Sequence, residues 1–162
     1  MRYRFVTVVL LSIAFMPEVA WADDQRTAVV VTPDGRDYIL NEMRTMLETV
    51  QNVVGGIASG DTKATAAAAR NSGMAMMKRI PSEIRMALPE DFRQMAMDNH
   101  ASFDALALAA EAGEPLKAQL TRLEQSMGAC SACHGMWRLD AGTPAPMMGN
   151  NKRMMSPEPH GH

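Results

Sequence analysis

Apolar side chains recur at alternating spacings of three and four residues along most of the chain, which is the period of one face of an α-helix. The first such run predicts a helix that ends at Gly60, and the second predicts a helix from about residue 62 to residue 79, before Pro81. The inward positions are Ile39, Met43, Met46, Val50, Val53 and Ile57 in the first helix and Ala66, Ala69, Gly73, Met76 and Ile80 in the second.

Two further helices are predicted in the second half of the chain. The third is expected to open at Pro89, followed by two acidic residues, and to end near Gly113. The fourth is expected from about residue 114 to Arg138, and His100 is expected on the exposed side of the third. The inward positions are Phe92, Met95, Ala96, Asn99, Phe103, Leu106 and Ala110 in the third helix and Leu116, Leu120, Leu123, Met127, Cys130, His134 and Trp137 in the fourth.

Four amphipathic helices with short connections predict an all-α fold, namely an antiparallel four-helix bundle. No strand is expected, because no segment shows a convincing alternation of apolar and polar residues. The small residues at 66–69 and at Gly73 would permit close approach of another helix, so a homodimer is considered as a partner state.

The two ends of the chain differ from its helical middle. Residues 1–22 carry Arg2 and Arg4, an apolar run and a small-residue cleavage site, which is the pattern of a secretory signal peptide. We therefore expect an exported, soluble, periplasmic protein with no integral membrane segment after cleavage. The helical domain is expected at 23–139, and the Met-, Pro- and His-containing tail at 140–162 is expected to be disordered.

Cys130, Cys133 and His134 form a C-x-x-C-H motif, the attachment signature of haem c. Two thiols one helical turn apart can reach one edge of a porphyrin, and the next residue can then ligate the iron. The chain has 2 cysteines, which are too few for a disulfide scaffold. A redox-active C-x-x-C would normally open a helix after a strand, and structural zinc would need two more ligands, so both alternatives are weaker.

From residue 34 to Arg138 the chain resembles the cytochrome c prime and cytochrome c-556 family, in which the attachment motif lies in the last of four helices. The specific part of the resemblance is the pattern C-x-x-C-H-x-x-aromatic-basic, which here begins at Cys130 and ends with Trp137 and Arg138. The resemblance implies one covalent haem c in the bundle. Trp137 would pack against the haem edge or the neighbouring helices, and Arg138 would pair with a haem propionate or face solvent.

The resemblance also implies that the residue over the other haem face comes from the first helix. Met43 matches that position on the inward stripe, so we expect its sulfur to ligate the iron opposite His134. Met46 is an alternative ligand, and an iron without a methionine ligand is another. The chain has 16 methionines, and such residues often serve only as core filler.

These features predict a monohaem electron carrier with a low-spin, His/Met-ligated iron and as yet unidentified redox partner proteins. The alternative is a high-spin protein that binds nitric oxide or carbon monoxide at an open distal site. An enzyme is not expected, because no acid–base or nucleophile cluster accompanies the motif. A nucleic-acid partner is not expected either, because the whole chain has a net charge of −2. A copper-handling role is a weaker alternative that uses the tail residues Met147, Met148, Met154, Met155, His160 and His162.

Overall fold

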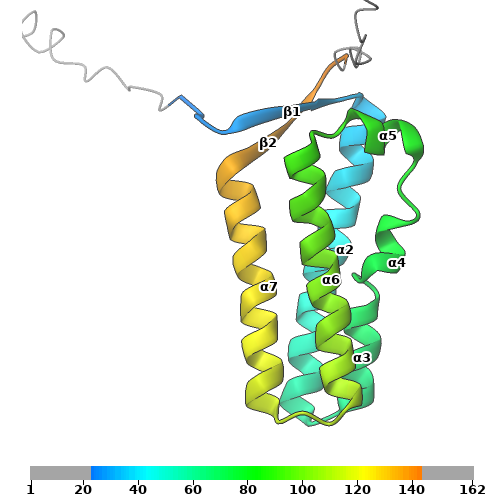
Figure 1. The fold of residues 1–162 in the computed structure, drawn as a ribbon, viewed down its shortest axis with the longest axis vertical. Helices are drawn as coiled ribbons and strands as arrows, with labels where there is room; N and C mark the ends of the chain where they lie inside the picture. Colours follow the sequence, from blue (N-terminus) through cyan, green and yellow to red (C-terminus); the bar gives the residue numbers. More distant parts are fainter. Residues whose placement is uncertain (1–22, 144–162) are drawn as a thin grey trace, which may run out of the picture.

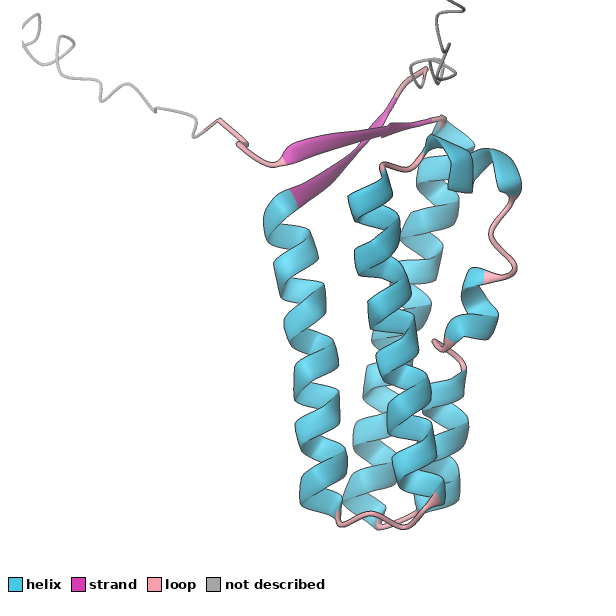
Figure 2. Cartoon of the chain, viewed as in Figure 1, coloured by secondary structure: helices cyan, strands magenta, loops and turns pink. Residues whose placement is uncertain are grey.

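Most of the described chain is helical. The structure, a computed structural model, describes residues 23–143, and helices account for most of this range (Figure 2). The long helices α2, α3, α6 and α7 lie side by side, and the short helices α4 and α5 lie in the connection from α3 to α6 (Figure 1). The predicted all-α class is confirmed at this level. The bounds are α2 Pro33–Ser59, α3 Thr62–Arg70, α4 Met74–Met77, α5 Ser82–Ala87, α6 Glu90–Glu111 and α7 Leu116–Met136.

Helix α2 begins and ends at residues that satisfy its free backbone groups. The Thr32 side chain accepts a hydrogen bond from the Gly35 backbone N–H at 3.1 Å, and a proline occupies the first helical position. Gly60 ends the helix with a φ of 70°, a left-handed conformation that glycine adopts without strain. The predicted inward stripe is confirmed, with Ile39, Val53 and Ile57 buried and Met43, Met46 and Val50 half-buried.

The prediction of a single helix from residue 62 to residue 79 is wrong. The chain leaves the helical path between Arg70 and Met74, so that α3 and α4 are separate elements. Asp104 of α6 explains the break, because its Oδ2 accepts a hydrogen bond from the Met74 N–H at 2.9 Å. A side chain of another element thus satisfies a backbone donor that a continuous helix would have paired internally.

A two-stranded parallel sheet crosses one end of the helices, although no strand was predicted (Figure 1). Strand β1 (Thr27–Val31) pairs with β2 (Trp137–Ala141) along its whole length. Val29 and Val31 are buried and Val30 is exposed, so β1 has the alternation of a half-buried strand. The fourth predicted helix therefore ends at Met136 rather than at Arg138.

The predicted boundary after residue 139 falls inside β2, which continues to Ala141. Pairing with β1 therefore places the first two residues of the predicted tail in the folded part of the chain. The signal peptide predicted at residues 1–22 and the rest of the tail, from residue 144 on, lie outside the described residues. Among the helices of residues 23–143, none is long and apolar enough to cross a membrane.

The core consists of two apolar clusters. The helical cluster contains Val53, Ile57, Ala66, Ala68, Ala69, Phe103, Leu106, Ala107, Ala110 and Leu123. The strand-end cluster contains Val29, Val31, Ile39, Ile84, Leu88 and Phe92. Most of the small residues of α3 that suggested a dimer contact are thus buried inside the chain. Gly73 is buried as well, and a Cβ at this position would clash with Asp104. Ala67 is the exposed member of the run.

Gly56 permits the close approach of α2 to α3. A Cβ at this position would lie 2.8 Å from the backbone nitrogen of Thr65, whereas a Cβ at Gly55 would meet nothing within 4 Å. Gly56→Ala is expected to lower the free energy of unfolding by roughly 1 to 3 kcal/mol, because backbone atoms must move apart. Gly55→Ala, the matched control, is expected to raise it by up to about 1 kcal/mol through helix propensity. Urea unfolding measures both, and equal effects would contradict the close approach.

Candidate functional site

A cavity of about 550 Å³ is bounded by α2, α6 and α7 and by the segment from α4 to α5. Most of the side chains that line it are apolar, and three groups with metal or haem chemistry are among them. The motif residues Cys130, Cys133 and His134 come from α7, the methionines Met43 and Met46 come from α2, and His100 comes from α6.

The motif occupies the last two turns of α7. Both cysteines are free and half-buried, and His134 is exposed. Burial raises the pKa of the Cys133 thiol, and the neighbouring Cys130 adds to the rise, so this thiol stays protonated at neutral pH. Spacings of three and four residues place the cysteines and the histidine within one helical turn. Helix geometry thus supplies two thiols and one imidazole at the same cavity.

The inward stripe predicted for α7 is partly wrong. Leu123 is buried as expected, but Leu116, Leu120 and Met127 are about half exposed. Polar residues take the buried positions instead, because α7 packs on α6 through hydrogen bonds. Ser126 Oγ lies 2.7 Å from Ser102 Oγ, and the Asn99 amide donates to the Cys130 sulfur at 3.5 Å. We call these two pairs the α6–α7 seam.

The two candidate methionine ligands have different neighbours. Met43 packs against the strand-end cluster, and so does Cys133. Met46, one turn further along α2, packs against the helical cluster. Met43 is therefore the methionine that shares a cluster with a motif cysteine. Both side chains line the cavity and are half-buried.

Trp137 and Arg138 lie in β2 and do not line the cavity. Trp137 packs edge-on against Phe92, with ring centroids 6.0 Å apart, and Phe92 is part of the cavity wall. Arg138 forms an ion pair with Asp140, and its Nε lies 3.9 Å from Oδ2 of Asp24. The structure thus connects Trp137 to the cavity through one ring and directs Arg138 to carboxylates outside it.

Three other arginines, which the sequence analysis missed, line the cavity: Arg44, Arg85 and Arg93. Arg44 follows Met43 directly, and Arg93 follows Phe92, so each stands beside a residue of an inward stripe. Long side chains can lie along an apolar wall while their guanidinium groups stay in water. Proximity in sequence to the inward stripe was the signal that could have identified Arg44 and Arg93.

The expectation that His100 is exposed is wrong. Its side chain is buried, and Nδ1 lies 2.6 Å from the carbonyl oxygen of Ser72, in the break between α3 and α4. Burial lowers the pKa of His100, and the Ser72 carbonyl and Asp104 partly oppose that effect. The imidazole is therefore held neutral, with one ring nitrogen fixed by the backbone.

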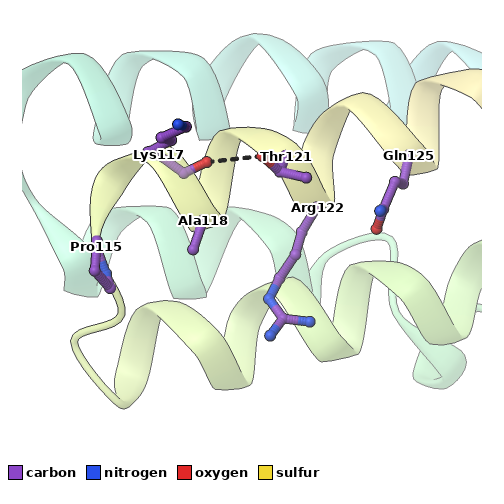
Figure 3. A pocket seen from close by; sticks show the side chains of 6 residues that line it. All are labelled: Pro115, Lys117, Ala118, Thr121, Arg122 and Gln125. Atoms are coloured by element: carbon purple, nitrogen blue, oxygen red, sulfur yellow. Dashed lines mark hydrogen bonds between the residues drawn. The ribbon is translucent and has the colours of Figure 1, made fainter.

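A second hollow lies along the N-terminal half of α7 and carries no comparable chemistry. It is lined by Pro115, Lys117, Ala118, Thr121, Arg122 and Gln125, and the Thr121 hydroxyl donates to the Lys117 carbonyl at 3.1 Å (Figure 3). Within residues 23–143, no group of three or more His, Cys, Asp or Glu side chains gathers where it could hold a metal ion. The cavity at the C-x-x-C-H motif is thus the candidate site.

His100 gives a prediction for the dependence of stability on pH. A lowered pKa in the folded state means that the unfolded chain takes up the proton first, so stability is retained above the ordinary pKa of 6.5 and falls as pH decreases through that value. His100→Gln removes this titration and keeps a polar side chain. We expect urea unfolding between pH 7.5 and about 5.5 to show a shallower decline for the variant. An equally steep decline in both proteins would contradict the buried neutral state.

Comparison with known proteins gives no relative on which to base a function. No family model matches the chain, and no match was found among curated proteins or solved structures. The chemistry of the cavity residues is therefore the basis for assigning a function.

Proposed function

We propose that this chain is an exported, periplasmic c-type cytochrome with a four-helix bundle and one covalent haem c, which transfers single electrons between redox partner proteins. Cys130 and Cys133 would hold the haem, and His134 and Met43 would ligate its iron. One observation carries the proposal: the C-x-x-C-H motif lies on the wall of a mainly apolar cavity to which α2 contributes two methionines.

The cavity residues fit a haem in size, polarity and donor chemistry. A volume of about 550 Å³ lies within the roughly 300–1,000 Å³ that is typical of ligand cavities. Free thiols, an imidazole and thioethers are the donor types found around covalently bound haem. A haem iron takes only its axial ligands from the protein, so the proposal does not require a cluster of three or more protein ligands.

Each group of side chains has a distinct role in this proposal. The thiols of Cys130 and Cys133 would hold the haem through its vinyl groups, and His134 of the same helix would bind its iron. Phe92, Phe103 and other apolar side chains of the wall keep water away from the ring. When bound, the haem supplies a one-electron iron couple. Its burial and a thioether ligand both favour the ferrous state.

Met43 is preferred over Met46 because of its neighbours. It packs against the same apolar cluster as Cys133, whereas Met46 packs against the other cluster. A ring attached through the cysteines would lie beside the strand-end cluster, which both Cys133 and Met43 contact. The arginines Arg44, Arg85 and Arg93 can pair with the haem propionates, which was one of the two roles expected for Arg138, the other being exposure to solvent.

The proposal predicts covalently bound haem. The purified protein should keep its haem through acid–acetone extraction, because thioether bonds survive denaturation. Cys130→Ala combined with Cys133→Ala should release all of it, whereas Ser131→Ala, between the two cysteines, should retain it. Absorption of the extracted fraction measures the outcome. Haem that extracts freely from the wild-type protein, or a protein without haem, would overturn the proposal.

The axial methionine gives a second prediction. Met43→Ala should convert a low-spin spectrum to a high-spin one, lower the reduction potential and allow carbon monoxide to bind. Met46→Ala should keep the low-spin spectrum and cost roughly 1 to 2 kcal/mol of stability, since its side chain is only half-buried. Absorption spectroscopy and potentiometry distinguish the two variants. Exchanged phenotypes would assign the ligand to Met46, and a high-spin wild type that binds carbon monoxide would favour gas binding over electron transfer.

A further inference from the structure

Asn99 lies on the buried face of α6, in contact with one of the two motif cysteines. Its Nδ2 donates a hydrogen bond to the Cys130 sulfur, with 3.5 Å between the two atoms. The residue is 8% exposed and lines the cavity. Its Oδ1 is buried and has no hydrogen-bond partner among the described residues. The Nδ2 group of the amide thus bonds to the Cys130 sulfur, and Oδ1 has no partner among the described residues.

An asparagine at position 99 destabilises the fold relative to an apolar residue, which suggests that its amide has a functional role. Asparagine is a weaker helix former than leucine, and a buried amide oxygen without a partner destabilises the folded state. Phe103 and Leu106, further along the same face of α6, are fully buried apolar residues. A leucine at position 99 would continue that face and remove both penalties.

The hydrogen-bonding capacity of the Cys130 sulfur differs between its thiol and thioether forms, and an amide can bond to both. A thiol can donate and accept a hydrogen bond, whereas a thioether can only accept one. An asparagine amide offers an acceptor at Oδ1 and a donor at Nδ2, and a half-turn of the amide exchanges them. Asn99 can therefore bind the Cys130 sulfur as a thiol through Oδ1 and as a thioether through Nδ2.

We propose that Asn99 is a positioning residue that holds the Cys130 sulfur toward the cavity in both of its chemical states, an inference that rests on the proposed haem attachment. On attachment the S–H bond of Cys130 adds across a vinyl double bond of the haem. A sulfur–carbon bond forms, the π bond breaks, and the hydrogen ends on the other vinyl carbon. The addition is redox-neutral overall, so its balance requires no oxidant or reductant.

The two cysteines differ in this respect. Cys133 packs against the strand-end cluster. Its position is thus set by apolar packing, whereas that of Cys130 is set by a polar contact across the α6–α7 seam. Loss of the Asn99 amide should therefore affect attachment at Cys130 and leave attachment at Cys133 intact.

The test compares Asn99→Leu with Ser102→Ala, a control in the same seam. The Ser102 hydroxyl bonds to Ser126 and to the Asn99 backbone carbonyl, and it contacts neither the Asn99 side-chain amide nor a cysteine. Each haem-loaded protein is denatured, treated with iodoacetamide and mapped by peptide mass spectrometry. We expect a severalfold increase in chains alkylated at Cys130 for Asn99→Leu, with Cys133 still attached. The pyridine haemochrome band should shift to longer wavelength, because one vinyl group remains unreacted. Ser102→Ala should match the wild type.

The outcomes separate this inference from the proposed function. Wild-type protein without covalent haem would overturn both. Full attachment of both cysteines in Asn99→Leu, with wild-type protein attached at both sites, would overturn the role of Asn99 and leave the cytochrome intact. Equal loss at Cys130 and Cys133 in an Asn99→Leu protein that unfolds cooperatively would also overturn it, because the amide would then not act on Cys130 alone.

A measurement on the wild-type protein covers the case in which Asn99→Leu does not fold. In the haem-loaded protein, the Nδ2 protons of Asn99 should exchange with solvent much more slowly than those of Gln94, an exposed residue of α6. Nuclear magnetic resonance of the side-chain amides measures both rates. Equally fast exchange at the two residues would show that the Asn99 amide does not hold the thioether sulfur, and would overturn the inference.

Discussion

The hydrogen-bonded seam between α6 and α7 fixes the rotation of α7, and the geometry of the candidate site depends on that rotation. Ser126 and Cys130 both face α6 because they bond to Ser102 and Asn99. Residues three and four apart share a helix face, so fixing these positions also fixes the direction of Cys133. Met127 is thereby left at the cavity rather than against α6. A polar contact thus overrides the apolar pattern and leaves the motif accessible.

The strand pair fixes the same helix at its C-terminal end. β1 and β2 join the beginning of the described chain to the segment that directly follows the motif. Arg26 donates to the carbonyl oxygen of His134 at 3.3 Å, which places a cation at the end of α7, where helix carbonyls lack partners. Arg26 also holds the pKa of the Asp24 carboxyl at about 2, mainly through a side-chain hydrogen bond. The histidine backbone is thus held by residues more than 100 positions earlier in the chain.

The sequence period predicted α2 and α6 correctly because both bury apolar stripes against other helices. It failed for α7, where Gln119 and Ser126 are buried in place of leucines, because hydrogen bonds between elements cannot be deduced from an apolar pattern. It failed at α3 for a similar reason, since the break there depends on the distant Asp104. The valines of β1 did carry a signal, but a five-residue strand needs a partner, and that partner lay over 100 residues away.

The candidate site likewise has a part that the sequence predicts and a part that depends on packing between helices. The cysteines and His134 are adjacent in sequence, so their chemistry was visible directly, and helix period placed Met43 and Met46 on one stripe. Choosing between the methionines requires the position of α2 relative to α7, which no local pattern contains. The structure supplies it through shared packing, because Met43 and Cys133 both contact the strand-end cluster. Three-dimensional packing, rather than spacing along the chain, is therefore the argument for Met43 as the partner of His134.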